Sequence, residues 1–197
     1  SSDAFITKFN PDGTKEWTRL LGGSLNDIGR ALTTGIDGSI YIAGDTEGDI
    51  DGQTNSGSSD AFITKFNPDG TKEWTKLLGS SESDIGHALT TGIDGSIYIA
   101  GSTYGDLDGQ TNNRYRDTFI SKYNPDGIKE WTKLLDIQEF NNYYVNTINT
   151  SIDGSLYLAS VQQEIETIIM EEDDPPPSYQ NYLRKYNSSG TNEWAIT

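Results

Sequence analysis

The side chains most able to do chemistry in this sequence are the oxygen-bearing residues of two acidic loops, residues 45–59 and 102–116. Each loop carries Asp, Asp, Gln and Asn at alternate positions, and a further Asp follows eleven residues after the first. Side-chain oxygens at positions 1, 3, 5, 7 and 12 are the spacing with which a loop wraps calcium, which takes about 6–8 hard oxygen ligands. The predicted calcium ligands are Asp49, Asp51, Gln53, Asn55 and Asp60 in the first loop and Asp106, Asp108, Gln110, Asn112 and Asp117 in the second.

The match to a calcium-binding loop is partial. An EF-hand loop has glycine at position 6 and glutamate at position 12, whereas both loops here have glycine at position 4 and aspartate at position 12. Asp, Asn and Gly also form Asx turns and accept left-handed backbone, so a solvated loop without metal is the alternative interpretation. Asp60 and Asp117 also fit the first position of a strand. In the third repeat, residues 171–177 are acidic and proline-rich and keep no ligand spacing.

The sequence offers no set of residues from which a catalytic site can be assembled. Its only histidine, His87, stands where Arg30 stands one repeat earlier, so a general acid or base there would exist in one repeat and not in its near-twin. Asp12 and Glu16 flank a turn and fit turn chemistry better than a glycosidase pair, whose acids must converge on one bond. The chain has no cysteine. We therefore expect no enzymatic activity.

The charge balance restricts the partners of the chain. Its 197 residues include 14 Lys and Arg against 30 Asp and Glu, a net charge of −16. Such a surface repels nucleic acids and favours cations. No apolar run approaches the roughly 20 residues of a membrane-spanning helix. We expect no nucleic-acid binding and no membrane span.

A tandem repeat must position the acidic loops. The four tryptophans each follow a glutamate, and they recur at intervals of 57, 57 and 63 residues. Residues 1–57 and 58–114 differ at only 10 positions, residues 115–177 form a looser copy, and residues 178–197 supply the opening of a fourth. The chain is therefore a single repeat region, residues 1–197, with about three and a half copies. The tryptophans are Trp17, Trp74, Trp131 and Trp194.

Each repeat predicts four short β-strands, because its segments are rich in β-branched and aromatic residues and are separated by turn residues. One pair of strands flanks a Pro-Asp-Gly turn and the other flanks an Asp-Gly turn. Neither face of these strands is consistently polar, so we expect both faces to be covered. The predicted strands are residues 4–10, 15–21, 31–36 and 39–44, followed by 60–67 and 72–78 in the second copy.

Four antiparallel strands per repeat, covered on both faces, are typical of the blades of a β-propeller. A solenoid is the rival architecture, but its repeats are usually shorter. Small apolar strands lie nearest the axis of a propeller, which places residues 31–36 innermost and residues 72–78 outermost. The chain then opens with an outer hairpin, residues 3–21, that lacks its two inner strands. We expect an incomplete propeller, as a segment of a longer repeat protein or as a chain that associates to complete a ring.

The repeated blocks resemble the bacterial β-propeller repeat family abbreviated SBBP. They read Asp-Ala-Phe-Ile-Thr-Lys-Phe-Asn-Pro-Asp-Gly, then Glu-Trp and Leu-Gly-Gly, then Asp-Gly-Ser-Ile-Tyr-Ile-Ala-Gly. The resemblance covers nearly the whole chain and is weakest in residues 136–146 and 160–181. It implies a large, secreted or cell-surface bacterial protein with several propeller blades, and it implies no particular activity.

Two functional hypotheses follow from these observations. The first is a non-enzymatic structural or adhesive interaction module, stiffened by calcium in its loops, with a protein or glycan partner at the cell surface or with a second copy of the chain. The second is a glycan-binding propeller or an ancillary domain of a surface hydrolase, in which the Glu-Trp pairs would stack on sugar. Recurrence of tryptophan at a fixed strand position favours packing between blades over sugar stacking.

Overall fold

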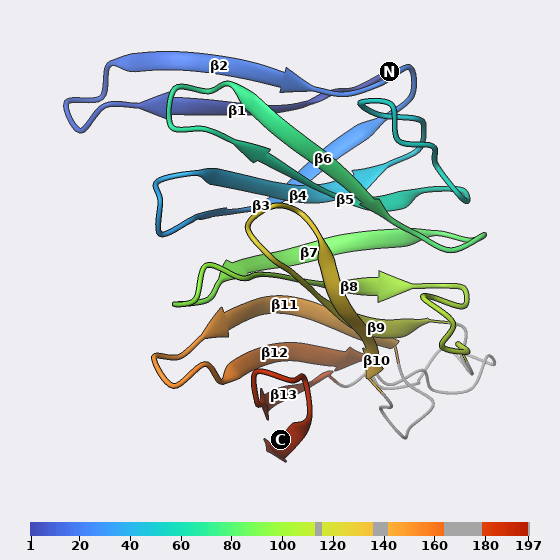
Figure 1. The fold of residues 1–197 in the computed structure, drawn as a ribbon. Coiled ribbons are helices and arrows are strands. Elements are labelled where there is room, and N and C mark those ends of the chain that lie inside the picture. Colours follow the sequence, from blue (N-terminus) through green and yellow to red (C-terminus); the bar gives the residue numbers. More distant parts are fainter. Residues whose placement is uncertain (113–115, 136–141, 164–178, 197) are drawn as a thin grey trace, which may run out of the picture.

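The computed structural model describes residues 1–112, 116–135, 142–163 and 179–196, and these residues contain β-strands and no helix. The strands form a two-stranded hairpin followed by three four-stranded sheets, which stack on one another from the N-terminus to the C-terminus (Figure 1). The predicted all-β fold of four-stranded antiparallel blades is confirmed. None of the described residues lies in a helix with the length and apolar character needed to cross a membrane.

The strands divide into four groups along the chain. The hairpin consists of β1 (Ala4–Phe9) and β2 (Lys15–Leu21). The first sheet contains β3 (Asp27–Thr34), β4 (Ile40–Thr46), β5 (Asp60–Phe66) and β6 (Lys72–Leu78). The second sheet contains β7 (Asp84–Thr91), β8 (Ile97–Thr103), β9 (Asp117–Tyr123) and β10 (Lys129–Leu135). The third sheet contains β11 (Asn142–Thr150), β12 (Leu156–Gln163), β13 (Tyr179–Tyr186) and β14 (Asn192–Ile196).

Each sheet is a meander in which every strand pairs antiparallel with the next strand in sequence. β3 and β6 lie at opposite edges of the first sheet, as predicted, and the bounds of β2 and β6 are the predicted ones. The prediction for β3 is wrong at its start, because the strand begins at Asp27 instead of residue 31. The backbone N–H of Asp27 donates to the carbonyl of Ser2 at 2.7 Å, and a bulge between Gly29 and Ala31 lets pairing with β4 continue past it.

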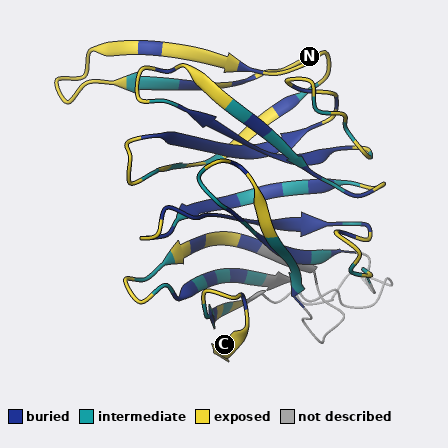
Figure 2. Cartoon of the chain, viewed as in Figure 1, coloured by how far each residue is buried: buried dark blue, intermediate teal, exposed yellow. Residues whose placement is uncertain are grey.

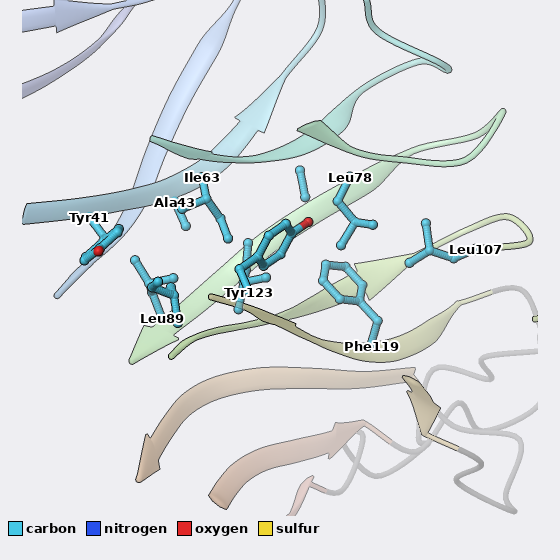
Figure 3. Close-up of a cluster of buried hydrophobic side chains, with 11 residues drawn as sticks. Tyr41, Ala43, Ile63, Leu78, Leu89, Leu107, Phe119 and Tyr123 are labelled. Carbon is cyan, nitrogen blue, oxygen red and sulfur yellow. The ribbon is translucent and has the colours of Figure 1, made fainter. Parts of the chain in front are cut away.

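Three apolar cores lie between successive layers of the stack. β4, β5 and β8 are buried along their whole length, so these strands of the first and second sheets are covered on both faces, as predicted (Figure 2). One core joins the hairpin to the first sheet, one joins the first sheet to the second, and one joins the second to the third. Figure 3 shows the middle core, which includes Tyr41, Ala43, Ile63 and Leu78 of the first sheet and Leu89, Leu107, Phe119 and Tyr123 of the second unit.

The tryptophans tie each outer strand to the next repeat. The Trp17 indole donates to the carbonyl of Pro68 at 3.3 Å, 51 residues further along the chain. Gly70 in that turn has φ +79°, and a Cβ added to it would lie 2.8 Å from the Trp17 ring. The turn therefore needs glycine both for its left-handed backbone and for contact with the indole. Trp74 repeats the arrangement against Pro125 and Gly127, which confirms the interpretation of these tryptophans as packing between blades.

Candidate functional site: the acidic loops and the boundary between blades

The acidic loops connect the second and third strands of a sheet and fold back against the protein. In the first loop, the backbone groups of Ile50 and Gln53 exchange hydrogen bonds of 2.8 and 3.1 Å. Asp51 and Gly52 occupy the turn with φ +51° and +75°, a conformation that aspartate and glycine adopt more readily than most residues. Ile50 is buried in the core beneath. The loop is thus anchored by an apolar side chain and closed by a tight turn, and the second loop repeats the turn.

The carboxylates at the first two predicted ligand positions bind protein donors. Asp49 Oδ1 accepts a hydrogen bond from the backbone N–H of Asn55 at 2.9 Å. Asp51 forms an ion pair with Lys72 on β6 and accepts from the Thr75 hydroxyl at 2.5 Å. The second loop repeats both contacts: Asp106 accepts from the N–H of Asn112 at 2.8 Å, and Asp108 pairs with Lys129 at 2.5 Å.

Amide side chains in the loops form hydrogen bonds with the backbone of neighbouring strands. Gln110 donates from Nε2 to Thr132 O at 2.8 Å and accepts from Leu134 N–H at 3.0 Å, so it bridges the backbone of β10. Asn55 donates from Nδ2 to Thr46 O at 2.9 Å, and Asn112 makes the same bond to Thr103 O at 3.2 Å. Gln53 is half-buried in the turn of its own loop.

Asp60, at the twelfth position of the predicted motif, lies apart from the loop carboxylates. It is the first residue of β5, and its Oδ2 accepts from Ser56 N–H at 3.0 Å. Its negative neighbour is Asp84, the first residue of β7, and not Asp49 or Asp51. Asp117, its counterpart in the next repeat, is the half-buried first residue of β9.

The structure therefore distributes the predicted ligands over three places. Asp49 accepts a hydrogen bond from Asn55 within the loop, and Asp51 forms an ion pair with Lys72 on β6. Asp60 lies near Asp84 at the start of the next sheet. In the part of the chain that the structure describes, no three Asp, Glu, His or Cys side chains gather as a metal-binding group. Calcium binding by the loops stays a prediction. The contacts of the loop side chains indicate that most of them stabilise the conformation of the loop.

His87 lies on β7 between two arginines, with Arg116 Nη2 3.1 Å and Ser102 Oγ 3.0 Å from its Nε2. Burial, together with the positive charges of Arg116 and Arg30, lowers the pKa of His87 to about 4. One repeat earlier, Arg30 forms an ion pair with Asp45 at the corresponding positions. The pair Arg30 and Asp45 is thus replaced one repeat later by His87 and Ser102, so the two changes compensate each other on neighbouring strands.

A stack of four-stranded antiparallel blades, with two consecutive sequence repeats each supplying two of the four strands of a blade, defines a β-propeller repeat protein. The comparisons with known families agree with this class. The SBBP β-propeller repeat matches residues 16–51 and 73–108, and a β-propeller domain of unknown function, DUF5122, matches residues 37–73. The resemblance to SBBP β-propeller repeats seen in the sequence is therefore confirmed over residues 16–51 and 73–108.

One curated relative is the regulatory protein FlaEY of Caulobacter vibrioides. It is 25% identical to this chain over 204 residues, which cover 98% of the chain and 21% of FlaEY. The chain thus spans about a fifth of the length of this relative. A sequence similar to this chain therefore occurs within a longer protein.

Proposed function

We propose that this chain is a non-enzymatic structural interaction module, whose open blade face binds a further repeat unit of the same kind. The bound unit supplies the two inner strands that the hairpin β1–β2 lacks. By such stacking, the repeats build a rigid array with a structural or adhesive role in a secreted or surface-attached bacterial protein.

The observation that carries the proposal is the exposure of apolar side chains whose repeat counterparts are buried. Leu32 on β3 is 55% exposed, whereas Leu89, its counterpart on β7, is 8% exposed because the first sheet covers it. Phe5 and Leu20 of the hairpin are likewise exposed. Large exposed apolar patches on a protein surface mark sites of association.

The shape of the open end fits two strands of the same kind. Among the described strands, β1 pairs only with β2, whereas its repeat counterpart β5 pairs with both β4 and β6, so no described strand occupies the other edge of β1. A groove of about 490 Å³ lies beside this edge, lined by Ala4, Phe5, Ile28 and Leu32 among others. An apolar β-hairpin such as β7–β8 matches the groove in pairing pattern and in chemistry.

The proposal can be tested with a peptide of residues 84–103, which spans the inner hairpin β7–β8. Isothermal titration calorimetry of this peptide into the intact chain is expected to show saturable binding. Leu32→Asp should weaken the binding by about tenfold or more, because it places a charge against an apolar partner. Ile36→Asp is the matched control, since Ile36 and its counterpart Ile93 are 71% and 60% exposed and neither is covered by a neighbouring sheet.

The outcome of this titration separates the proposal from its rivals. Absence of binding to the intact chain contradicts the proposal, as does binding that Leu32→Asp leaves unchanged. Equal losses in Leu32→Asp and Ile36→Asp would assign the interaction to general hydrophobicity and not to the open blade face.

A further inference from the structure

Asp60 and Asp84 begin two strands of neighbouring sheets and lie side by side across the boundary between them. The residues just before them, Ser59 and Ser83, form a parallel bridge, and their hydroxyl oxygens are 2.6 Å apart. The backbone N–H of Asp84 donates to Ser59 O at 2.7 Å. Because paired strands lie about 4.8 Å apart, this bridge brings the two carboxylates next to each other.

Both carboxylates are buried, and only one of the two oxygens of each accepts a hydrogen bond. Asp60 is 1% exposed and Asp84 is fully buried. Oδ2 of Asp84 accepts from the N–H and the hydroxyl of Ser80 at 2.6 and 2.8 Å, and Oδ2 of Asp60 accepts from Ser56. Oδ1 of each residue has no hydrogen-bond partner among the described residues. Buried carboxylate oxygens without partners are costly, so each calls for a positive charge or a proton.

No described basic side chain compensates this pair. The ion pairs within the described residues leave out both Asp60 and Asp84. The hydroxyl of Thr103, opposite Asp84 on β8, donates to Gly105 O at 2.8 Å and also acts on Asp84, where it lowers the pKa of the carboxyl without offsetting the effect of burial. Burial raises the pKa of both carboxyls, and the charge of Asp84 raises the pKa of Asp60 further.

The same arrangement recurs one repeat earlier, 57 residues toward the N-terminus. The backbone N–H of Asp27 donates to Ser2 O at 2.7 Å, and Oδ1 of the buried Asp27 has no partner among the described residues. A Cβ added at Gly22 would lie 2.8 Å from the carboxyl carbon of Asp3 and from Oδ2 of Asp27. Recurrence at two of the three boundaries between layers makes the pair more than a feature of one place.

A glycine leaves room for the carboxylates in each case. A Cβ added at Gly79 would lie 2.1 Å from the carboxyl carbon of Asp60, so any larger residue would displace this side chain. The backbone of the loop after β6 therefore approaches Asp60 as closely as glycine allows.

We propose that the Asp60–Asp84 pair is a cation site at the boundary between the first and second sheets, and that it binds calcium. The donors offered there are all oxygens, which select a hard cation. Two carboxylates balance the charge of a divalent ion, and hydroxyl, carbonyl and water oxygens complete its coordination. Asp3 and Asp27 form a second, weaker site, because Asp3 is exposed. This inference is independent of the binding of a further repeat unit.

The site differs from the predicted loop site in its residues, which gives a discriminating experiment. Asp84 belongs only to the pair and Asp49 only to the loop. Calcium binding to the intact chain is measured by isothermal titration calorimetry, and thermal unfolding is followed in calcium and in EDTA. Calcium is expected to raise the midpoint of unfolding of the wild-type chain. Asp84→Asn should lose this shift and weaken calcium binding by about tenfold or more, whereas Asp49→Asn should retain both.

Folding of the variant is checked in the same measurement. Asp84→Asn removes an uncompensated buried charge with little change in shape, so in EDTA it should unfold at a midpoint equal to or above that of the wild-type chain. An unchanged calcium shift in Asp84→Asn overturns the proposal, as does loss of the shift in Asp49→Asn alone, which would place calcium in the loop. The proposal is also overturned if calcium does not raise the midpoint of unfolding of the wild-type chain. In that case the two carboxyls would share a proton instead of a cation.

Discussion

The hairpin β1–β2 and the strands β5–β6 have the same sequence through their first eighteen repeat positions, residues 1–18 and 58–75, yet they lie in different surroundings. Phe5 on β1 is 66% exposed, whereas Phe62, its counterpart on β5, is 1% exposed. Phe9 and Phe66 differ in the same way. Identical local sequence thus produces the same strands and turn at both places, while a neighbouring layer determines what is buried.

This difference shows where the stability of a repeat protein resides. The hairpin contributes Ala4, Ile6 and Leu21 to the core that it shares with the first sheet, and its other face has no layer against it. β5 is covered on both faces. In repeat proteins, stability is the sum of the terms within repeats and the terms between neighbours, so one substitution should have two different costs at the two positions.

The largest expected contrast is between Phe62→Ala and Phe5→Ala. Phe62→Ala should lower the free energy of unfolding by about 3–5 kcal/mol, because it opens a cavity between the hairpin and the first sheet. Phe5→Ala should change it by less than about 0.5 kcal/mol, because Phe5 is exposed. Urea denaturation followed by tryptophan fluorescence measures both. Similar losses in the two variants would mean that Phe5 is also covered in solution.

The repetition made much of the fold predictable from sequence. Strand type, strand order and the incomplete first blade followed from residues that alternate and turn locally, such as the Pro-Asp-Gly turn at residues 11–13. The start of β3 at Asp27 did not follow, because its backbone pairs with Ser2 of the preceding unit. A backbone hydrogen bond between two units does not change the spacing of apolar residues within one strand, so the sequence pattern does not indicate it.

The candidate sites were less predictable, because their partners come from elsewhere in the fold. The alternate spacing of Asp49 and Asp51 is the same whether these residues hold a cation or hold a loop, and only the fold brings Lys72 to Asp51. The pairing of Asp60 with Asp84 was missed for the same reason. The one signal in the sequence was the recurring interval of 24 residues from Asp3 to Asp27 and from Asp60 to Asp84.

A smaller contrast is expected between His87 inside the stack and Arg30 at the open end. The pKa of His87 is lowered to about 4 from an ordinary value of 6.5, so the folded chain binds fewer protons there than the unfolded chain. Stability from this group is present above pH 6.5 and is lost as pH falls from 6.5 to about 4. The loss should be about 1–3 kcal/mol, because part of the side chain meets solvent.

His87→Gln isolates this effect, since glutamine can accept the hydrogen bond from Arg116 and does not titrate. Urea denaturation at pH 7 and about pH 4.5 should show a smaller loss of stability for His87→Gln than for the wild-type chain. Arg30→Gln should also show a smaller loss than the wild-type chain, because it removes a positive charge that helps to lower the pKa of His87. If His87→Gln and the wild-type chain lose the same stability, the imidazole is not held neutral by its surroundings.

The smallest contrast concerns the lysines that pair with the glutamate before each tryptophan. Lys8 is 36% exposed and pairs with Glu16 at 3.0 Å, whereas Lys65 is 7% exposed and pairs with Glu73 at 3.0 Å and with Asp37 at 3.8 Å. Burial by itself would lower the pKa of Lys65, but the hydrogen bond and charge of Glu73 raise it above its ordinary value. The interior pair is therefore the one that depends on its partners.

Lys65→Met should lower the free energy of unfolding by about 1 kcal/mol, because it removes the cation from Glu73 and Asp37 and the hydrogen bond that the buried ammonium donates to Pro125 O at 3.3 Å. Lys8→Met should cost about 0–0.5 kcal/mol, as exposed pairs do. Urea denaturation in low salt and in about 1 M NaCl distinguishes them, because salt screens the exposed pair much more than the buried one. The cost of Lys65→Met should persist in high salt, while that of Lys8→Met disappears. If both variants lose the same free energy of unfolding in low salt and neither loses any in high salt, a neighbouring layer changes the exposure of these lysines without strengthening their ion pairs.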